Sequence, residues 1–500
     1  MADTFTELRT ALETIDDLER AAAVLGWDQM TYMPRGGLGS RADHLATLSV
    51  LAHERLTRPD VGALLERLAE ECAGAPEDDP RHAFLRTARR AYDLAVRIPP
   101  DLVEREAKIS AQAYETWVAA REANDFGIFA PDFARVVQVS REKAEALGYP
   151  EEPYDALLDL SEPGMTARSA AELLDELKGT LVPLAAEIAE RGRPVDRGVL
   201  QGHFPDERQW DLGLDAIRAF GFDFARGRQD RSIHPFTTSF GVGDVRITTR
   251  IDEEFFASGL YSTLHEAGHG MYEQGLPAEW QRTPLGKAIS SGVHESQSRL
   301  WENFVGRSQA FWSFFLPKAQ EAFPAELGSL DLEAVYRAVN AVERSLVRVD
   351  ADEVTYNLHI AVRLEVERAL LQGELAAEDV PAAWAEKMRA YLGIVPPDDL
   401  QGALQDIHWT GGLGGFIGYT VGNVVAGQLW QAAERSIGDL PGHIARGDFA
   451  PLLAFLRRGV HELGSRLTTE ECLRQATGQG LTTEPYLRYI EGKFRAIYAI

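Results

Sequence analysis

The chain contains 500 residues, of which 45% are hydrophobic, so it can bury one large core or a few smaller ones and is globular rather than disordered. Its 51 basic and 77 acidic residues give a formal net charge of -26, which repels phosphate backbones and anionic lipid and argues against nucleic acid or a membrane as a partner. Its two cysteines, Cys72 and Cys472, have no metal-ligand spacing and indicate no disulfide framework, which fits a reducing compartment.

The first residues are acidic and amphipathic and lack the features of a secretory signal, so we expect a cytoplasmic protein. No apolar run approaches the length that spans a bilayer. Apolar residues at helical spacing predict helix after helix from residue 4 to about residue 230. The glycine-rich break at Gly36–Gly39 is expected to be a loop before a helix that begins near Ser40.

The pattern changes at His234, where two short β-rich runs flank residues 241–244 and predict a hairpin. In its second strand, a period of two places four residues on one face, namely Asp244, Arg246, Thr248 and Arg250. Such alternation is most often a solvent-facing edge with paired charges. An arginine fork at this place is the alternative, because it can bind a substrate carboxylate through two hydrogen bonds. Helices resume at Glu253 and continue to the C-terminus, interrupted by a glycine-rich stretch at residues 408–423.

The segment Ser262–Gln274 contains an HExxH pattern, His265-Glu266-Ala-Gly-His269. On a helix, histidines four residues apart project from one face, where both imidazoles can reach one ion, and this geometry suits zinc. Glu266 then lies beside the ion, where it can accept a proton from water. The alternative is an ordinary helix that matches the pattern by chance.

A catalytic zinc needs a third protein ligand. The candidates downstream are Glu273, Glu279, Glu295 and Glu302. We favour Glu295, because it opens a new helix after a loop and can approach the ion from a neighbouring helix. Glu273 lies two turns beyond His265 on the same helix, so its carboxylate is expected to point past the ion. The plain alternative for Glu295 is an acid in the first turn of a helix.

Other polar residues have both a functional and a structural interpretation. His234 and His408 stand in aromatic, apolar company, where a histidine is more often a hydrogen-bonded core residue. Arg348 is expected to be a buried ion-pair partner of a nearby aspartate, at position 350 or 352. Tyr419, in the glycine-rich stretch, can donate a hydrogen bond to an oxyanion or can simply pack.

Five motifs in this order resemble the carboxypeptidase Taq family of HExxH metallocarboxypeptidases. They are HPF at 234–236, DVRIT at 244–248, HEAGH at 265–269, HESQ at 294–297 and GALQDIHW at 402–409. Further segments, LGWDQMTYMP, RVDADEVTYNLHI and PYLRYIEGKF, extend the resemblance over nearly the whole chain. One stretch departs from the family pattern, because GGFIGYTVGN lacks the family's proline and follows a shorter loop, which affects the surroundings of Tyr419.

The resemblance implies a mainly α, multi-helix, homodimeric peptidase with a deep groove and a small β-hairpin beside the HExxH helix. It implies a single catalytic unit over residues 1–500, in which residues 1–230 include a groove lid and residues 231–500 carry the metal site and the C-terminal helices. The expected substrates are peptides with a free C-terminus, and the expected cofactor is Zn²⁺, with Co²⁺ or another divalent ion as alternatives.

Carried over position by position, the resemblance assigns His265, His269 and Glu295 as metal ligands and Glu266 as the general base. The candidate substrate-binding residues are His234, Asp244, Arg246, Thr248, Arg348, Gln405, Asp406, His408 and Tyr419. Either Arg246 or Arg348 is expected to hold the C-terminal carboxylate of the substrate. Two alternatives stay open, a zinc oligopeptidase or endopeptidase on a similar fold, and a non-catalytic helical protein with a structural metal.

Overall fold

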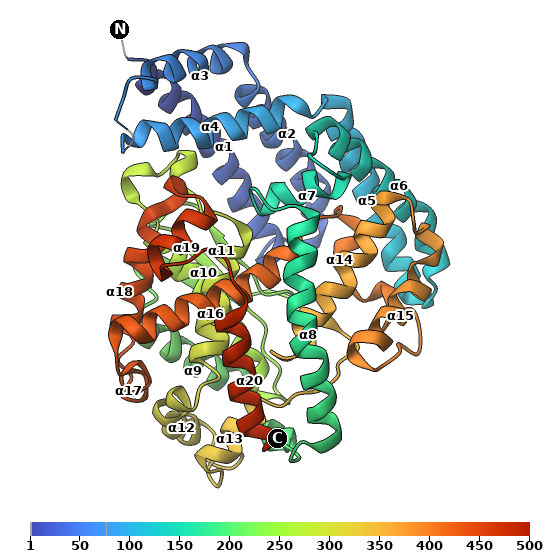
Figure 1. The fold of residues 1–500 in the computed structure, drawn as a ribbon, viewed down its shortest axis with the longest axis vertical. Helices are drawn as coiled ribbons and strands as arrows, with labels where there is room; N and C mark the ends of the chain where they lie inside the picture. Colours follow the sequence, from blue (N-terminus) through green and yellow to red (C-terminus); the bar gives the residue numbers. More distant parts are fainter. Residues whose placement is uncertain (1–2, 77) are drawn as a thin grey trace.

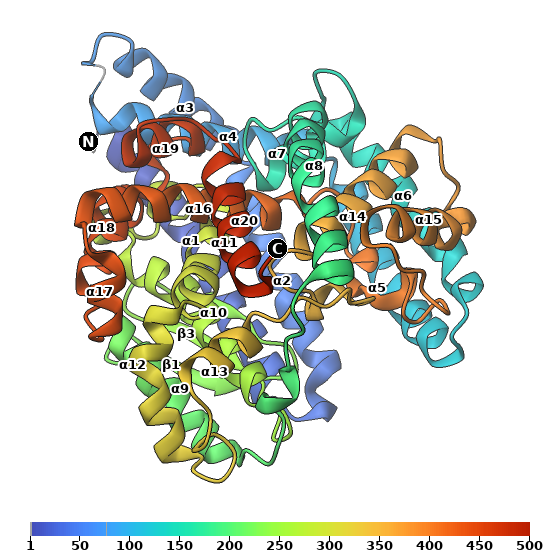
Figure 2. The same cartoon turned by 60° about the horizontal axis from the view of Figure 1, so that its bottom comes forward.

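The computed structural model describes residues 3–76 and 78–500, and it confirms the expected mainly α fold (Figure 1). Within these residues, helices surround one small sheet. Figure 1 shows the N-terminal helices toward one end of the molecule, and Figures 1 and 2 both show the C-terminal helix beside α8 (Ala167–Arg191). None of the helices that the structure describes has the length and apolar character needed to cross a membrane.

Four helices form the N-terminal layer, α1 (Thr4–Thr31), α2 (Leu38–Leu56), α3 (Pro59–Cys72) and α4 (Pro80–Arg97). The helices α3 and α4 begin with proline, whose fixed φ suits the first helical turn. Leu8, Leu65 and Phe84 are fully buried in a small core of this layer. The expected break before α2 is a short 3₁₀ turn at Arg35–Gly37, and α2 begins slightly earlier than predicted.

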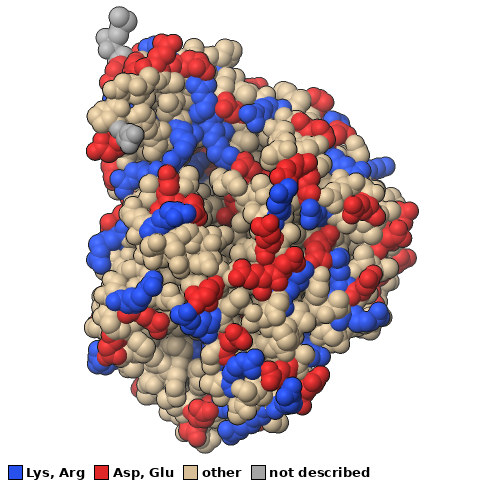
Figure 3. Space-filling view, in the orientation of Figure 1, with Lys and Arg blue, Asp and Glu red and all other residues tan. Residues whose placement is uncertain are grey.

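The helix α4 attaches this layer to its surroundings through basic side chains. Its arginines are Arg81, Arg86, Arg89, Arg90 and Arg97. Figure 3 shows basic residues gathered over α4 on a face where the two signs of charge are otherwise interspersed. Arg89 pairs with Glu66 of α3 at 2.6 Å, and Arg90 pairs with Asp159 of α7 (Pro153–Ser161) at 2.7 Å. The local basic charge is therefore used in contacts within the chain.

Five further helices complete the first half of the chain, α5 (Pro100–Ala123), α6 (Phe126–Leu147), α7 (Pro153–Ser161), α8 (Ala167–Arg191) and α9 (Asp206–Phe220). The prediction that helices continue to about residue 230 was wrong. The helix α9 ends at Phe220 because Gly221 takes a left-handed conformation, with φ of 105°, which glycine adopts without strain.

The sheet consists of β1 (Gly227–Arg231), β2 (Thr237–Ser239) and β3 (Val245–Thr249), in the order β1-β3-β2. The predicted hairpin is confirmed, since β2 and β3 pair antiparallel. The parallel strand β1 was not expected, because its polar sequence carries no strand pattern and only its pairing with β3 makes it a strand. The ionic face predicted for β3 is confirmed only in part, because Asp244 and Arg246 pair with each other, whereas Thr248 is fully buried and Arg250, beyond the strand, is exposed.

Two helices follow the sheet and carry the HExxH and HESQ motifs. They are α10 (Phe256–Gly275), which packs on β3, and α11 (Ser291–Arg299), which continues into a π-helical turn at Leu300–Val305. The hydroxyl of Ser290 accepts a hydrogen bond from the backbone N–H of Val293 at 3.1 Å and caps the start of α11.

The helix α11 is held between two helices at glycine contacts. A Cβ atom on Gly268 of α10 would lie 2.6 Å from the carbonyl oxygen of Gln297 in α11. A Cβ atom on Gly422 of α16 (Ile417–Ile437) would lie 2.6 Å from Cβ of Glu295. Neither position has room for a side chain, so the two glycines set how closely α11 approaches its neighbours.

The remaining helices are α12 (Gln309–Ala322), α13 (Leu332–Val339), α14 (Tyr356–Gln372), α15 (Val380–Leu392), α17 (Leu440–Ala445), α18 (Ala450–Gly459), α19 (Thr469–Thr477) and α20 (Glu484–Tyr498). The main hydrophobic core takes its residues from Ala113 through Tyr498. The core therefore contains residues from both parts that the sequence distinguishes, 1–230 and 231–500.

Replacement of Gly422 by alanine should lower the free energy of unfolding by about 1–3 kcal/mol, the usual cost of overpacking a filled contact. The matched control is Gly179→Ala in α8, where a Cβ atom meets nothing within 4 Å and alanine favours the helix by about 1 kcal/mol. Denaturant titration of both variants measures the difference. Equal stabilisation by the two substitutions would contradict the close approach of α11 to α16.

Candidate metal centre

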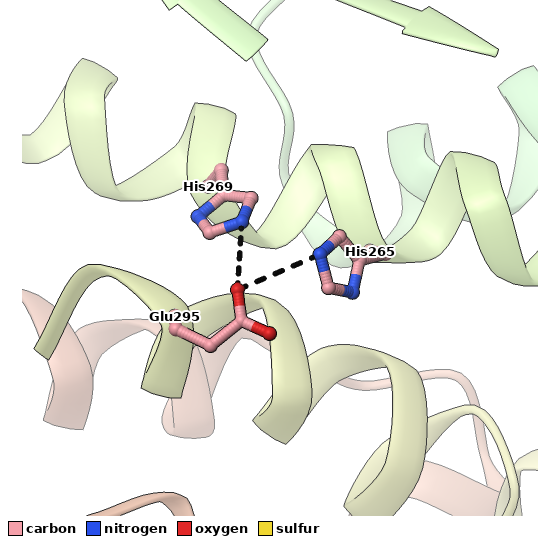
Figure 4. A group of neighbouring side chains, drawn as sticks. All are labelled: His265, His269 and Glu295. Carbon is pink, nitrogen blue, oxygen red and sulfur yellow. Dashed lines mark ion pairs between the residues drawn. The ribbon is translucent and has the colours of Figure 1, made fainter. Parts of the chain in front are cut away.

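Three side chains converge between α10 and α11. His265 and His269 project from one face of α10, and Glu295 points toward them from α11 (Figure 4). Oε2 of Glu295 lies 3.7 Å from Nε2 of His265 and 3.3 Å from Nε2 of His269. All three atoms lie within 4.8 Å of one another. Two imidazole nitrogens and one carboxylate oxygen form a donor set that suits zinc and similar divalent ions.

The other nitrogen of His265 is held by Glu302. Nδ1 of His265 lies 2.9 Å from Oε2 of Glu302, which is buried on the π-helical turn that continues α11. Because an ionised carboxylate only accepts hydrogen bonds, Nδ1 carries the proton and Nε2 keeps its lone pair on the side of Glu295. Glu302, the alternative third ligand, thus lies behind His265 and orients its ring.

The other nitrogen of His269 is held by a second histidine. Nδ1 of His269 lies 2.6 Å from Nδ1 of His294, and Nε2 of His294 lies 2.9 Å from Oε1 of Glu273. Because Glu273 accepts, Nε2 of His294 donates to it, and Nδ1 of His294 is left to accept from His269. Nε2 of His269 then keeps its lone pair for an ion. Glu273 points past the three ligand atoms, and it fixes a ligand through His294.

The surroundings of Glu295 and His269 favour the protonation states that metal coordination requires. At His265, by contrast, burial is outweighed by Glu295 and Glu302, which raise the pKa of its imidazole. Burial opposes ionisation of Glu295, but Arg299 and the two histidines outweigh it and hold the pKa of Glu295 below its ordinary value. Nε of Arg299 donates to Oε1 of Glu295 at 2.6 Å. The pKa of Glu302 falls to about 2 against the effect of burial, because His265 donates to it and Arg299 lies near. Burial lowers the pKa of His269 to about 4, so its imidazole is neutral at pH 7.

Glu266 lies beside the ligands and is 6% exposed. Oγ1 of Thr237, on β2, donates to Oε2 of Glu266 at 2.6 Å, and it also lies 3.0 Å from the Glu266 backbone carbonyl. Burial raises the pKa of Glu266, while His265 and Thr237 act in the opposite direction. A raised pKa makes a carboxylate a stronger proton acceptor, and the bond to Thr237 fixes its position next to the ligands.

A second polar cluster surrounds Arg348, which precedes α14. Nε of Arg348 donates to Oδ2 of Asp406 at 3.1 Å, and Nη1 donates to the hydroxyl oxygen of Tyr356 at 3.1 Å. The backbone N–H of Arg348 donates to Oε1 of Gln405 at 2.9 Å. The buried ion pair was predicted, but its partner is Asp406 rather than the aspartate at 350 or 352, because the chain brings residues 405 and 406 back against Arg348.

Aromatic rings and His408 complete this cluster. The Arg348 guanidinium lies 5.1 Å from the ring centre of Phe416 and 5.3 Å from that of Tyr419. Nδ1 of His408 contacts Oδ1 of Asp406, and its side chain is 41% exposed. His408 is therefore not a buried core residue, although a histidine in apolar, aromatic sequence surroundings more often is one.

His234 lies near the same cluster, on the loop between β1 and β2. Its side chain is accessible to solvent, and partial desolvation by neighbouring groups together with the charges of His408 and Arg348 lowers its pKa. Oγ1 of Thr248 accepts from the backbone N–H of Phe236 at 2.9 Å and from the hydroxyl of Ser232 at 2.7 Å. Thr248 thus fixes the loop that carries His234 and does not itself reach the cluster.

Arg246 and Asp244 lie elsewhere. Nε and Nη2 of Arg246 each donate to a carboxylate oxygen of Asp244 at 2.9 Å. The guanidinium also lies 4.2 Å from the ring centre of Trp27 in α1 and 4.9 Å from that of Phe240. The fork of Arg246 is therefore already occupied, and it joins the sheet to the N-terminal layer.

Several residues of the site were not identified from the sequence. His294 belongs to the HESQ motif, but it received no role. Arg299 stands four residues after Glu295, a spacing that indicates a helical ion pair, and its guanidinium lies 4.3 Å from the Tyr356 ring centre. Thr237 and Tyr356 carry no comparable signal. Arg299 and Tyr356 connect the three ligand side chains to the Arg348 cluster.

Loss of His294 should weaken divalent-ion binding, because Nδ1 of His269 loses the partner that fixes its ring. Removal of such a partner typically costs about 10- to 100-fold in affinity, so we expect His294→Ala to release zinc to a chelator at correspondingly lower chelator concentration. His443→Ala is the control, since His443 pairs with Asp448 in a surface contact apart from the site. Unchanged zinc affinity in His294→Ala would contradict the orienting role.

Known proteins resemble this chain over nearly its whole length. Residues 7–494 match the carboxypeptidase Taq (M32) metallopeptidase family. Thermostable carboxypeptidase 1 of Thermus thermophilus is 46% identical over 495 residues, which cover 96% of each chain. Carboxypeptidase 1 of Bacillus subtilis is 35% identical over 98% of this chain and 97% of its own. The crystal structure of an M32 carboxypeptidase from Deinococcus radiodurans superposes with a TM-score of 0.95 and 42% identity, over 99% of this chain and 100% of that one.

Proposed function

The chain belongs to the carboxypeptidase Taq (M32) family of metallopeptidases and is a metal-dependent carboxypeptidase, and we propose a role for each of its site residues in this reaction. His265, His269 and Glu295 hold the divalent ion, Glu266 is the general base, and the Arg348 cluster receives the free C-terminus of a peptide. The observation that carries the proposal is the convergence of three ligand atoms within 4.8 Å, with Glu266 beside them on α10.

Zinc is the ion we propose, with cobalt as the next candidate. The donor set of two imidazoles and one carboxylate fits both ions, and the bonds from Glu302 and His294 keep the Nε2 lone pairs directed at the ion. An ion bound there would polarise the scissile carbonyl and lower the pKa of a water molecule.

The protein groups then move one proton. The Glu266 carboxylate takes the proton from the attacking water and returns it to the nitrogen of the leaving residue, so that one C–N bond breaks and one C–O bond forms. The hydroxyl of Thr237 keeps the carboxylate in place, since it donates to Oε2 at 2.6 Å. Oε1 is then the oxygen available for the proton.

Arg348 is our candidate for the anchor of the substrate carboxylate. Its Nε and Nη1 are bonded to Asp406 and Tyr356, and Nη2 makes no hydrogen bond to another group among residues 3–76 and 78–500. Arg246, the other candidate, uses both Nε and Nη2 on Asp244. His408 and Tyr419 lie around Arg348 and offer further donors. A substrate carboxylate bound to Arg348 would place the C-terminal peptide bond at the ion, so that this bond is the one cleaved. The homodimer stays a prediction.

Glu266→Gln should keep the metal and lose turnover, because glutamine cannot accept the proton from water. We expect kcat to fall by about 100- to 10,000-fold, the usual contribution of a general base, with metal content equal to that of the wild type. Glu279→Gln, at an exposed glutamate, is the control and should leave kcat unchanged. Turnover near the wild-type rate in Glu266→Gln would exclude Glu266 as the base.

The anchor is tested with paired peptides that carry a free or an amidated C-terminus. The wild type should remove single residues from the free peptide and leave the amide intact, whereas an endopeptidase would cut both. Arg348→Gln should lower kcat/KM on the free peptide by about 10- to 100-fold, the contribution of a hydrogen bond to a charged group. Arg246→Gln is the matched control. A larger loss in Arg246→Gln than in Arg348→Gln would reverse the assignment.

A further inference from the structure

A buried ion pair lies directly behind the Arg348 cluster. Arg363 and Glu367 are one turn apart on α14, and their side chains are 1% and 0% exposed. Nε of Arg363 donates to Oε1 of Glu367 at 2.6 Å. The hydrolysis proposed above uses neither residue. Because desolvation of two charges often cancels their attraction, such a pair is weak evidence for stability, and an apolar pair of similar volume can serve that purpose.

The second oxygen of Glu367 joins three separate segments of the chain. The hydroxyl of Tyr154, on α7, donates to Oε2 of Glu367 at 2.8 Å. The backbone N–H of Gly414, in the glycine-rich loop before α16, donates to the same oxygen at 3.0 Å. A Cβ atom on Gly414 would lie 2.9 Å from the backbone carbon of Leu157, so the loop presses against α7. One carboxylate therefore fixes the loop to α7 and α14.

The guanidinium of Arg363 supports the rings that surround Arg348. It lies 3.1 Å from the ring centre of Trp409 and 4.4 Å from that of Phe416. Phe416 also lies 5.1 Å from the guanidinium of Arg348, so this ring contacts both cations. Trp409 directly follows His408 in the chain. Nη1 and Nη2 of Arg363 have no hydrogen-bond partner in the described parts of the chain, so the rings and Glu367 set its orientation.

Asp406 connects the two arginines electrostatically. Burial opposes its ionisation, but His408, Arg363 and Arg348 together hold the pKa of Asp406 well below its ordinary range. Asp406 in turn accepts from Nε of Arg348. A change in the position or charge of Arg363 therefore alters the electrostatic surroundings of Asp406, which orients Arg348.

We propose that Arg363, Glu367 and Tyr154 form a positioning unit for the subsite that receives the C-terminal carboxylate, an inference that rests on the proposed anchoring role of Arg348. Glu367 fixes the glycine-rich loop and the orientation of Arg363, and Arg363 fixes Trp409 and Phe416 beneath His408 and Arg348. The unit touches neither substrate nor ion. Its loss should therefore weaken binding of the peptide while the chemistry at the metal continues.

The chain supplies a matched control in another buried carboxylate. Glu353 pairs with Lys493, the two side chains are 5% and 6% exposed, and the hydroxyl of Tyr489 donates to Oε2 of Glu353 at 3.0 Å. Tyr154→Phe and Tyr489→Phe each remove one hydroxyl from a buried carboxylate. Glu367→Gln and Glu353→Gln each remove the charge and keep the shape. The two sets differ in whether the carboxylate supports the Arg348 cluster.

The zinc-loaded variants are compared on a short peptide with a free C-terminus. We expect KM to rise about tenfold in Glu367→Gln and about threefold in Tyr154→Phe, the equivalent of one hydrogen bond or less. In both, kcat should stay within about twofold of the wild type and metal content should be unchanged. Tyr489→Phe and Glu353→Gln should lower the denaturant midpoint and leave KM at the wild-type value.

An equal KM shift in the two sets, or a fall in kcat with loss of metal, would make the Arg363–Glu367 pair a structural contact and overturn the proposal. If Glu367→Gln does not fold, Tyr154→Phe alone decides. The wild type is measured in parallel on the amidated peptide. If the wild type cleaves both peptides equally, the anchoring role of Arg348 and the positioning role of Arg363, Glu367 and Tyr154 are both excluded. If it discriminates and Tyr154→Phe has the wild-type KM, the positioning unit alone is excluded.

Discussion

The close approach of α11 to α10 and α16 is the constraint on which the rest of the site depends. Gly268 and Gly422 remove the Cβ atoms that would hold the helices apart. The helix α11 has only nine residues, and a helix of this length is not stable in isolation. Its position is therefore set by packing, and that packing places the Glu295 oxygen 3.3 Å from Nε2 of His269. The three candidate ligands meet because α10 and α16 carry glycine at these two contacts.

Carboxylates then define which nitrogen of each histidine is available. Glu302 accepts from His265 directly, and Glu273 accepts through His294, so both Nε2 atoms keep their lone pairs on the same side. Arg299 donates to Glu295 and lies over the ring of Tyr356, whose hydroxyl oxygen accepts from Arg348. Arg299 and Arg348 therefore place positive charge in the interior of a chain whose net charge is -26.

The sequence predicted the helical fold, the β2–β3 hairpin and the helix that carries the HExxH pattern, because each depends on local periodicity. It ranked Glu295 above Glu302 because a new helix was expected at the HESQ motif. It missed β1, whose pairing with β3 is not a local property, and it gave the wrong partner for Arg348, because Asp406 lies 58 positions away in the chain. His294 and Arg363 show the same limit, since their contacts arise only when separate helices pack.

Diffraction from zinc-loaded crystals, with anomalous data at the zinc edge, tests the central claim most directly. We expect one ion bonded to Nε2 of His265, Nε2 of His269 and a carboxylate oxygen of Glu295, with Glu302 and His294 hydrogen-bonded to the two Nδ1 atoms. An ion bonded through either Nδ1, or bonded to Glu302 in place of Glu295, would show that α11 does not hold the third ligand as described.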